Sequence, residues 1–174
     1  DPQGRIRCIL TLARHTGRRV SAIIKLRASD VLLTTDRIRV ALAAASMDAG
    51  LADHIPRGAV RWSAETDKQG ILHITPISAR MRAEVDRYLS GRPRLGDVPL
   101  FPAPNHAEKP MRRDVAARWL LKAERLAELP RLVGGVWHPY RRLGATERKQ
   151  YSDIDVAAAG GWKNVKALKL NYQQ

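Results

Sequence analysis

Residues 137–142 read WHPYRR, which places one histidine and two arginines within a single short segment. Like charges this close repel one another unless an anion lies among them. His138 precedes Arg141 by three residues, so on a helix both side chains face the same way. The segment, completed by Arg142, therefore predicts a binding site for a negatively charged group such as a phosphate.

Other parts of the chain carry groups that could act on the same anion. They are two arginines at a loop-to-helix junction, a lysine at the tip of an expected hairpin and two aromatic residues near the end of the sequence: Arg18, Arg19, Lys68, Trp162 and Tyr172. Taken singly, each has a more ordinary interpretation as a solvated charge or a packed ring. Their combination is what points to chemistry.

Together these residue types fit phosphoryl transfer at a DNA phosphodiester. Arg19 and Arg141 can grip the non-bridging oxygens, where charge grows toward the transition state, because a guanidinium matches two phosphate oxygens and stays protonated. Lys68 can protonate the leaving 5′ oxygen. Tyr172 can act as the nucleophile, since neighbouring cations lower the pKa of a phenol. This chemistry needs neither metal nor cofactor, and none is expected.

The composition supports a folded protein with a polyanionic partner. The chain has 174 residues, of which 44% are hydrophobic, enough for the core of one domain. Lys and Arg number 31 against 17 Asp and Glu, a formal charge of +14, so double-stranded DNA is the expected partner. Binding to a membrane surface is the rival interpretation, but it favours one basic amphipathic helix, and here the charge is spread along the chain. No apolar run is long enough to span a membrane. The one cysteine, Cys8, can form no internal disulfide and is expected to be buried.

Periodicity predicts a mostly α protein with a small antiparallel β-sheet (α+β). Apolar residues at helical spacing predict helices over 5–14, 36–50, 78–89, 112–129, 139–149, 152–161 and 163–172, and another helix that begins at residue 20. Alternation on both sides of a polar turn predicts a β-hairpin over 59–77. The proline-rich stretch 91–110 is expected to be a loop. The helix over 112–129 is expected to bury one stripe formed by Val115, Trp119, Leu120, Ala123 and Leu126.

The constellation of these residues, in this order along the chain, resembles the catalytic domain of tyrosine site-specific recombinases, the phage integrase family. TGRRVSAIIKLRASDV resembles the first box of that family, which selects Arg19 over Arg18 as the catalytic arginine. HPYRR resembles the second box and gives His138 and Arg141. The resemblance covers almost the whole chain.

The remaining motifs fall in the family's order between and after these boxes. DKQGILHITPI resembles the family's hairpin, whose catalytic lysine would be Lys68. AAAGGWKN resembles the element in which many members carry histidine at the position of Trp162, whose indole can donate a hydrogen bond but cannot shuttle a proton. Tyr172 follows near the family's spacing. Each box alone occurs by chance; five in order are a specific signal.

The resemblance implies an activity and an assembly. The protein would cleave and rejoin DNA through a 3′-phosphotyrosine in site-specific recombination or integration of a mobile element. Further phosphate contacts are expected from Arg18, Arg142 and Lys163. Residues 1–174 would form one catalytic domain of a longer prokaryotic, nucleoid-associated cytoplasmic protein, with an N-terminal core-binding domain and a C-terminal tail outside it. The family acts as a homotetramer on DNA, whereas this piece alone is expected to be monomeric.

Two departures keep other interpretations open. Ala22 stands where the family usually has an acidic residue that steadies the arginines, so either another carboxylate compensates or activity is reduced. Tyr172 lies ten residues after Trp162, one more than in many members. The alternatives are a DNA-binding module with impaired catalysis and a type IB topoisomerase-like enzyme, which shares the chemistry.

Overall fold

Helices dominate the structure, and the strands form two small antiparallel sheets. The computed structural model describes residues 4–66, 70–91 and 96–172. The helices in these ranges are α1 (Arg5–Thr16), α2 (Val20–Ile23), α3 (Thr35–Ala44), α4 (Ala79–Ser90), α5 (Arg113–Leu126), α6 (His138–Thr146), α7 (Asp153–Gly160) and α8 (Val165–Tyr172), with 3₁₀ turns η1 (Ala28–Asp30) and η2 (Ala49–His54). The strands are β1 (Val31–Leu32), β2 (Ala59–Trp62), β3 (His73–Pro76), β4 (Pro102–Ala103) and β5 (His106–Pro110). The expected fold class is confirmed.

The main sheet has the order β1-β2-β3 and is antiparallel throughout. Val60 pairs with Thr75 across the predicted hairpin and with Val31 on the other side. The sequence did not predict β1, because a two-residue strand gives no alternation. It was also wrong about 91–110, where β4 and β5 form a second hairpin. The β5 residues are all exposed, so no hydrophobic pattern marks them as a strand.

Two helix predictions need correction. The predicted helix over 36–50 ends at Ala44, and η2 follows it, because the side chain of Asp48 accepts a hydrogen bond from the backbone N–H of Gly50 and starts a separate turn. Helix α5 buries Ala116 and Leu120, while Leu126 is 76% exposed. The predicted stripe was wrong at its C-terminal end, since the last turn of α5 extends past the elements on which its first turns pack.

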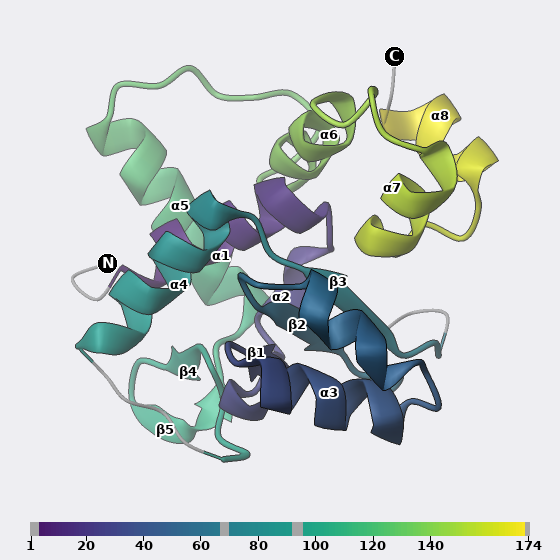
Figure 1. The fold of residues 1–174 in the computed structure, drawn as a ribbon. Coiled ribbons are helices and arrows are strands. Elements are labelled where there is room, and N and C mark those ends of the chain that lie inside the picture. The colour runs from purple at the N-terminus through teal and green to yellow at the C-terminus, as the bar shows by residue number, and fades with distance from the viewer. Residues whose placement is uncertain (1–3, 67–69, 92–95, 173–174) are drawn as a thin grey trace.

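The buried hydrophobic residues separate into clusters. The large core joins α1, α2, α4, α5 and the sheet, and its fully buried members include Ile9, Trp62, Phe101 and Leu120. The C-terminal cluster is smaller and joins α6, α7 and α8; it consists of Ala145, Val156, Ala157, Trp162, Leu168 and Tyr172. In Figure 1 these three helices lie together beyond the C-terminal end of α1, with α6 between α1 and α8.

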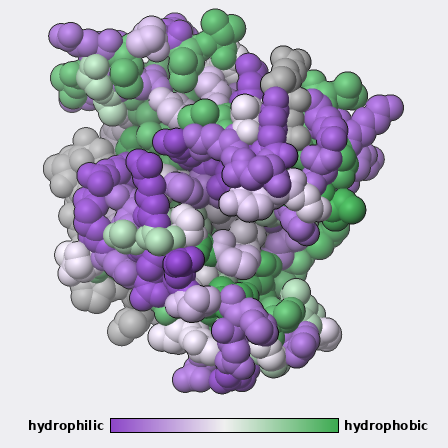
Figure 2. Space-filling model, turned by 45° about the horizontal axis from the view of Figure 1, so that its top comes forward, coloured by the Kyte–Doolittle hydropathy of each residue, from purple (hydrophilic) through white to green (hydrophobic). Residues whose placement is uncertain are grey.

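The surface is strongly polar. Figure 2 shows hydrophilic residues over most of the visible face, with hydrophobic residues in small groups among them. Across the described residues, no helix is both long enough and apolar enough to cross a lipid bilayer.

Candidate active site

The sharp turn between α1 and α2 places Arg19. Gly17 ends α1 in the left-handed region (φ +69°), and its N–H donates to the carbonyl of Ala13. A Cβ at Gly17 would lie 2.7 Å from the ring of Trp162, so only glycine allows this conformation and this approach together. Arg19 follows as the N-terminal cap of α2, with its side chain exposed to solvent.

Helix α6 carries the second group of predicted residues. Pro139 lies in its first turn, which suits a helix start, as predicted. His138 is exposed at this end, and Arg141, one turn later, is only 3% exposed. Helix α6 approaches α1 so closely that a Cβ at Gly144 would lie 2.2 Å from the carbonyl oxygen of Arg14. Arg141 therefore lies on a helix that touches α1 backbone to backbone, and Arg19 follows three residues after the end of α1.

Arg141 lies among aromatic rings. Its guanidinium carbon is 4.1 Å from the centre of the Trp162 ring and 5.2 Å from that of Tyr172, both within cation–π range. Among the described residues, none of its three side-chain nitrogens has a hydrogen-bond partner of acceptable geometry. Burial and the nearby charge of Arg19 lower the pKa of Arg141 to about 10, with Tyr172 acting in the opposite direction. The group is thus cationic at neutral pH, and among the described residues it has no acceptor that meets the geometric criteria for a hydrogen bond.

The aromatic residues form a continuous stack beside Arg141. The ring centroids of Trp162 and Tyr172 are 5.1 Å apart in an edge-to-face arrangement, and those of His138 and Tyr172 are also 5.1 Å apart. The backbone carbonyl of Tyr172 accepts a hydrogen bond from the Thr146 hydroxyl at 3.2 Å. The indole N–H of Trp162 is buried without a partner among the described residues. Two buried donor groups therefore lie close together without an acceptor of acceptable geometry in the part of the chain that the structure describes.

His138 is held toward its neutral form. Partial burial lowers the pKa of its imidazole, and the positive charges of Arg141, Arg142 and Arg19 lower it further. The imidazole at neutral pH is accordingly able to accept a proton. The same electrostatic coupling shows that His138, Arg19 and Arg141 share one neighbourhood.

Two adjoining cavities open onto these residues. One of about 310 Å³ is lined by Arg18, Arg19, His138 and Arg141, and also by Arg113 from the start of α5. The other cavity, of about 300 Å³, is also lined by Arg18, Arg19 and Arg141. It extends to Ala22, Glu65 and Gly160. Each has room for a phosphate group, and both are rich in positive charge.

The remaining predicted residues lie in different settings. Arg18 is 2% exposed and donates to the carbonyls of Ala159 (2.7 Å) and Ala158 (3.0 Å) at the end of α7, so its guanidinium is engaged inside the protein. Arg142 and Lys163 are exposed near the site, as phosphate contacts would require. Lys68 lies outside the described residues. The roles predicted for these four side chains stay predictions.

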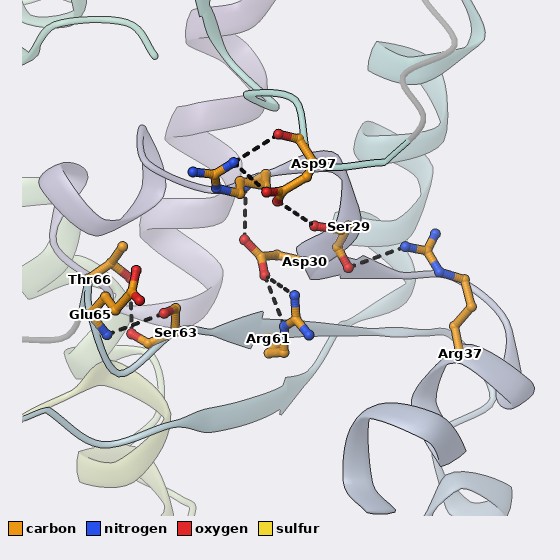
Figure 3. Close-up of polar contacts among 9 residues, drawn as sticks. Ser29, Asp30, Arg37, Arg61, Ser63, Glu65, Thr66 and Asp97 are labelled. Carbon is orange, nitrogen blue, oxygen red and sulfur yellow. Dashed lines mark hydrogen bonds and ion pairs between the residues drawn. The ribbon is translucent and has the colours of Figure 1, made fainter. Parts of the chain in front are cut away.

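A carboxylate network fixes the strand that leads to the second cavity. The carboxylate of Asp30, which is buried, accepts from the guanidinium of Arg61 (Figure 3) at a distance of 3.0 Å. It also accepts from the backbone N–H of Arg27 at 2.9 Å. Beyond β2, the Ser63 hydroxyl accepts from the backbone N–H of Glu65 at 3.2 Å and shapes the turn that brings Glu65 to the cavity wall.

Sequence reasoning missed Arg113 and Glu65. Arg113 lies next to Arg112, which pairs with Asp114 at 2.9 Å, so the sequence alone does not show which arginine faces the site. Glu65 is the carboxylate in the cavity wall that also contains Ala22. Its position in the middle of a polar turn gave no signal.

Comparison with protein-family models and with curated proteins gives no match. Among solved structures, the chain is similar to the Tn1549 transposon integrase in complex with transposon right end DNA, at TM-score 0.62 and 14% identity. It is also similar to a second variant of that integrase in complex with a circular intermediate DNA, at TM-score 0.62 and 13% identity. The alignments cover 96% of this chain and 54% of each integrase chain, so this chain spans about half their length. At such identities the likeness shows a shared fold.

Proposed function

We propose that this chain is the catalytic domain of a tyrosine-type site-specific DNA recombinase. The observation that carries the proposal is the environment of Arg141: a buried, protonated guanidinium with no hydrogen-bond acceptor of acceptable geometry among the described residues, flanked by Arg19, His138, Trp162 and a phenol. A phosphodiester oxygen is the acceptor that would satisfy these donors. Similarity of fold to a transposon integrase supports the same function.

The cleavage step follows from these groups. The oxygen of Tyr172 attacks the scissile phosphorus, the bond from phosphorus to the 5′ oxygen breaks, and a 3′-phosphotyrosine forms. Neutral His138 takes the phenol proton, and the leaving 5′ oxygen receives a proton, for which Lys68 is the predicted donor. Arg19 and Arg141 hold the non-bridging oxygens as their charge grows. Attack by a 5′ hydroxyl of a partner strand reverses each step, so no external energy source is needed.

A nicked DNA substrate tests the proposal. A duplex drawn from the DNA that flanks the gene, with a nick just beyond the cleavage point, loses its short 5′-hydroxyl fragment after attack and traps the covalent complex. We expect a protein–DNA band that withstands denaturation. It should disappear in Tyr172→Phe and fall by about 100-fold or more in Arg141→Ala. Phe at position 172 keeps the ring packing, so loss of the band would reflect the missing hydroxyl.

Two observations favour a second function. Tyr172 is 9% exposed and packed on two rings, and Ala22 replaces the acid expected beside the arginines. Both features fit a DNA-binding module that holds phosphate without cleaving it. Binding to the nicked duplex without any covalent band would support this module and exclude the enzyme. Relaxation of supercoiled DNA by the protein alone would instead support a topoisomerase-like activity.

A further inference from the structure

Arg148, just beyond the end of α6, makes contacts that its sequence position does not suggest. Its Nη1 donates to the carbonyls of Gly144 (2.6 Å) and Arg14 (3.0 Å), and its Nη2 donates to the carbonyl of His15. Gly144 belongs to α6, whereas Arg14 and His15 form the last turn of α1. One partly buried guanidinium thus joins two helices through their backbones.

These carbonyls are the ones that a helix end leaves without partners. The last four carbonyls of an α-helix have no intrahelical donor. At the end of α1, the N–H of Gly17 satisfies Ala13, and Arg148 satisfies the next two carbonyls along the chain. A cation is also favoured there by the helix dipole. Arg148 therefore completes the C-terminal cap of α1 from a different part of the chain.

The capped end of α1 leads directly into the site. Gly17 and Arg18 alone separate it from Arg19, while α6, which Arg148 also holds, carries Arg141. Backbone hydrogen bonds from Arg148 consequently connect the two segments that bear the predicted phosphate clamps. Rotation or withdrawal of either helix would break at least one of them.

We propose that Arg148 is a positioning residue, which sets the separation of Arg19 from Arg141 and so the fit of a phosphate between them. This inference rests on the proposed function, since the phosphate is that of the proposed substrate. Arg148 touches no reacting atom in this role and acts only through the ends of α1 and α6. Arg18 makes the matching contact on the other side, where it caps the carbonyls of Ala158 and Ala159 in α7.

The test compares Arg148→Met with Arg14→Met, both measured well below their unfolding temperatures. Arg14 lies at the same helix crossing, and its side chain pairs with Glu147 at 3.0 Å without touching a backbone carbonyl. Both variants remove one positive charge and keep a long side chain. Two quantities are measured: the single-turnover rate of covalent complex formation at saturating nicked DNA, and the affinity for sodium sulfate by calorimetry, counting only the heat that Arg141→Ala abolishes.

We expect Arg148→Met to slow covalent complex formation at least 10-fold while the Kd for DNA changes less than about twofold, and to weaken sulfate binding several-fold. Arg14→Met should leave both quantities within about twofold. Arg148→Lys, which keeps the charge but not the fork of donors, should recover only part of the rate. Full recovery by lysine, or unchanged sulfate affinity in Arg148→Met, would overturn the inference.

The sulfate measurement separates this inference from the proposed function. If the unsubstituted protein forms no covalent complex yet Arg148→Met still weakens sulfate binding, the enzyme proposal fails and the positioning role stands. If covalent complexes form and Arg148→Met alters neither rate nor sulfate affinity, the positioning role fails alone. Absence of any Arg141-dependent sulfate binding would remove the anion site, and the inference with it.

Discussion

The large core and the C-terminal cluster differ in how many of their buried hydrogen-bond donors have an acceptor. In the large core, the indole N–H of Trp62 donates to the Thr75 hydroxyl at 3.1 Å, and the hydroxyl of Tyr88 donates to the carbonyl of Leu100 at 2.9 Å. In the C-terminal cluster, the indole of Trp162 and the guanidinium it covers have no acceptor among the described residues. The large core has an exception in the indole N–H of Trp137, which is also buried without a partner among the described residues and immediately precedes His138 at the edge of the site.

This difference separates a stabilising region from a binding region. A buried donor without an acceptor raises the free energy of the folded state, so proteins keep few of them. Several such donors in one place are explained if a bound ligand supplies the hydrogen-bond acceptors that the protein lacks. We infer that the large core supplies most of the folding free energy and that the C-terminal cluster gives up part of its own stability to bind an anion.

The largest expected effect is in the large core. Phe101→Ala should lower the free energy of unfolding by about 3–5 kcal/mol, because the ring is fully buried and its removal leaves a cavity. Urea unfolding followed by circular dichroism measures this loss. Sulfate affinity, measured in the folded protein, should stay the same. A change in sulfate affinity would show that the two regions are not independent.

Gly160→Ala should disturb the C-terminal cluster instead. Its new Cβ would lie 1.6 Å from the Trp162 ring, so the ring must shift from its present position beside Arg141. We expect a loss of about 1–3 kcal/mol in unfolding free energy, together with weaker sulfate binding. Gly91→Ala is the matched control, because nothing lies within 4 Å of its added Cβ. Equal effects of the two substitutions would contradict the close packing of Trp162.

Arg141→Met should remove binding without loss of stability. A buried charge without a partner is replaced by an apolar side chain of similar length, so the free energy of unfolding should stay level or rise by about 1 kcal/mol. Sulfate binding should vanish. The exposed neighbour serves as the control: Arg142→Met should change stability by less than about 0.5 kcal/mol. A loss above about 2 kcal/mol in Arg141→Met would show that this arginine stabilises the fold.

The smallest effect concerns pH. Burial lowers the pKa of His15 and His138 below the ordinary 6.5, so the folded protein binds fewer protons than the unfolded chain. Stability should therefore be unaffected well above pH 6.5 and decline as the pH falls below it. The pKa of Glu147 is also lowered, chiefly by its hydrogen bond with Arg14, but it affects stability only below about pH 4.5.

NMR titration of the two imidazoles extends the comparison to the site. Added sulfate should raise the pKa of His138, which lines the cavity, and leave that of His15 unchanged. His15 lies at the end of α1 and contacts the Ser78 hydroxyl at 3.3 Å. A parallel shift of both histidines would indicate general ionic screening rather than an anion bound at Arg141.

The sequence predicted most elements and the convergence of distant residues, but not the contacts that depend on neighbours. Gly17 marked the end of α1, and alternation marked the hairpin of β2 and β3, because both signals are local. The strand β5 and the exposed position of Leu126 gave no such signal. Arg148 looked like one more surface charge, because the carbonyls it caps belong to a helix more than 130 residues earlier.

In the proposed site as well, the sequence predicted the positions of some residues and not those of others. His138, Arg141, Trp162 and Tyr172 were expected together, and the structure brings them together around the guanidinium. Arg18 was expected to face a phosphate, and the structure turns it toward the end of α7. Adjacent residues at a turn point in different directions, so residue type and spacing could not separate Arg18 from Arg19 without the resemblance.

The backbone contact at Gly144 decides which part of the site is free to move. Since α6 meets the carbonyl of Arg14 with no side chain between them, any shift of Arg141 must carry α1 and the large core with it. Tyr172, in contrast, lies in the last turn of α8, which rests on its neighbours through ring contacts and the Thr146 hydroxyl. We therefore expect Arg141, a proposed phosphate ligand, to be held rigidly by α1 and the large core, and Tyr172, the proposed nucleophile, to be the part of the site that can shift.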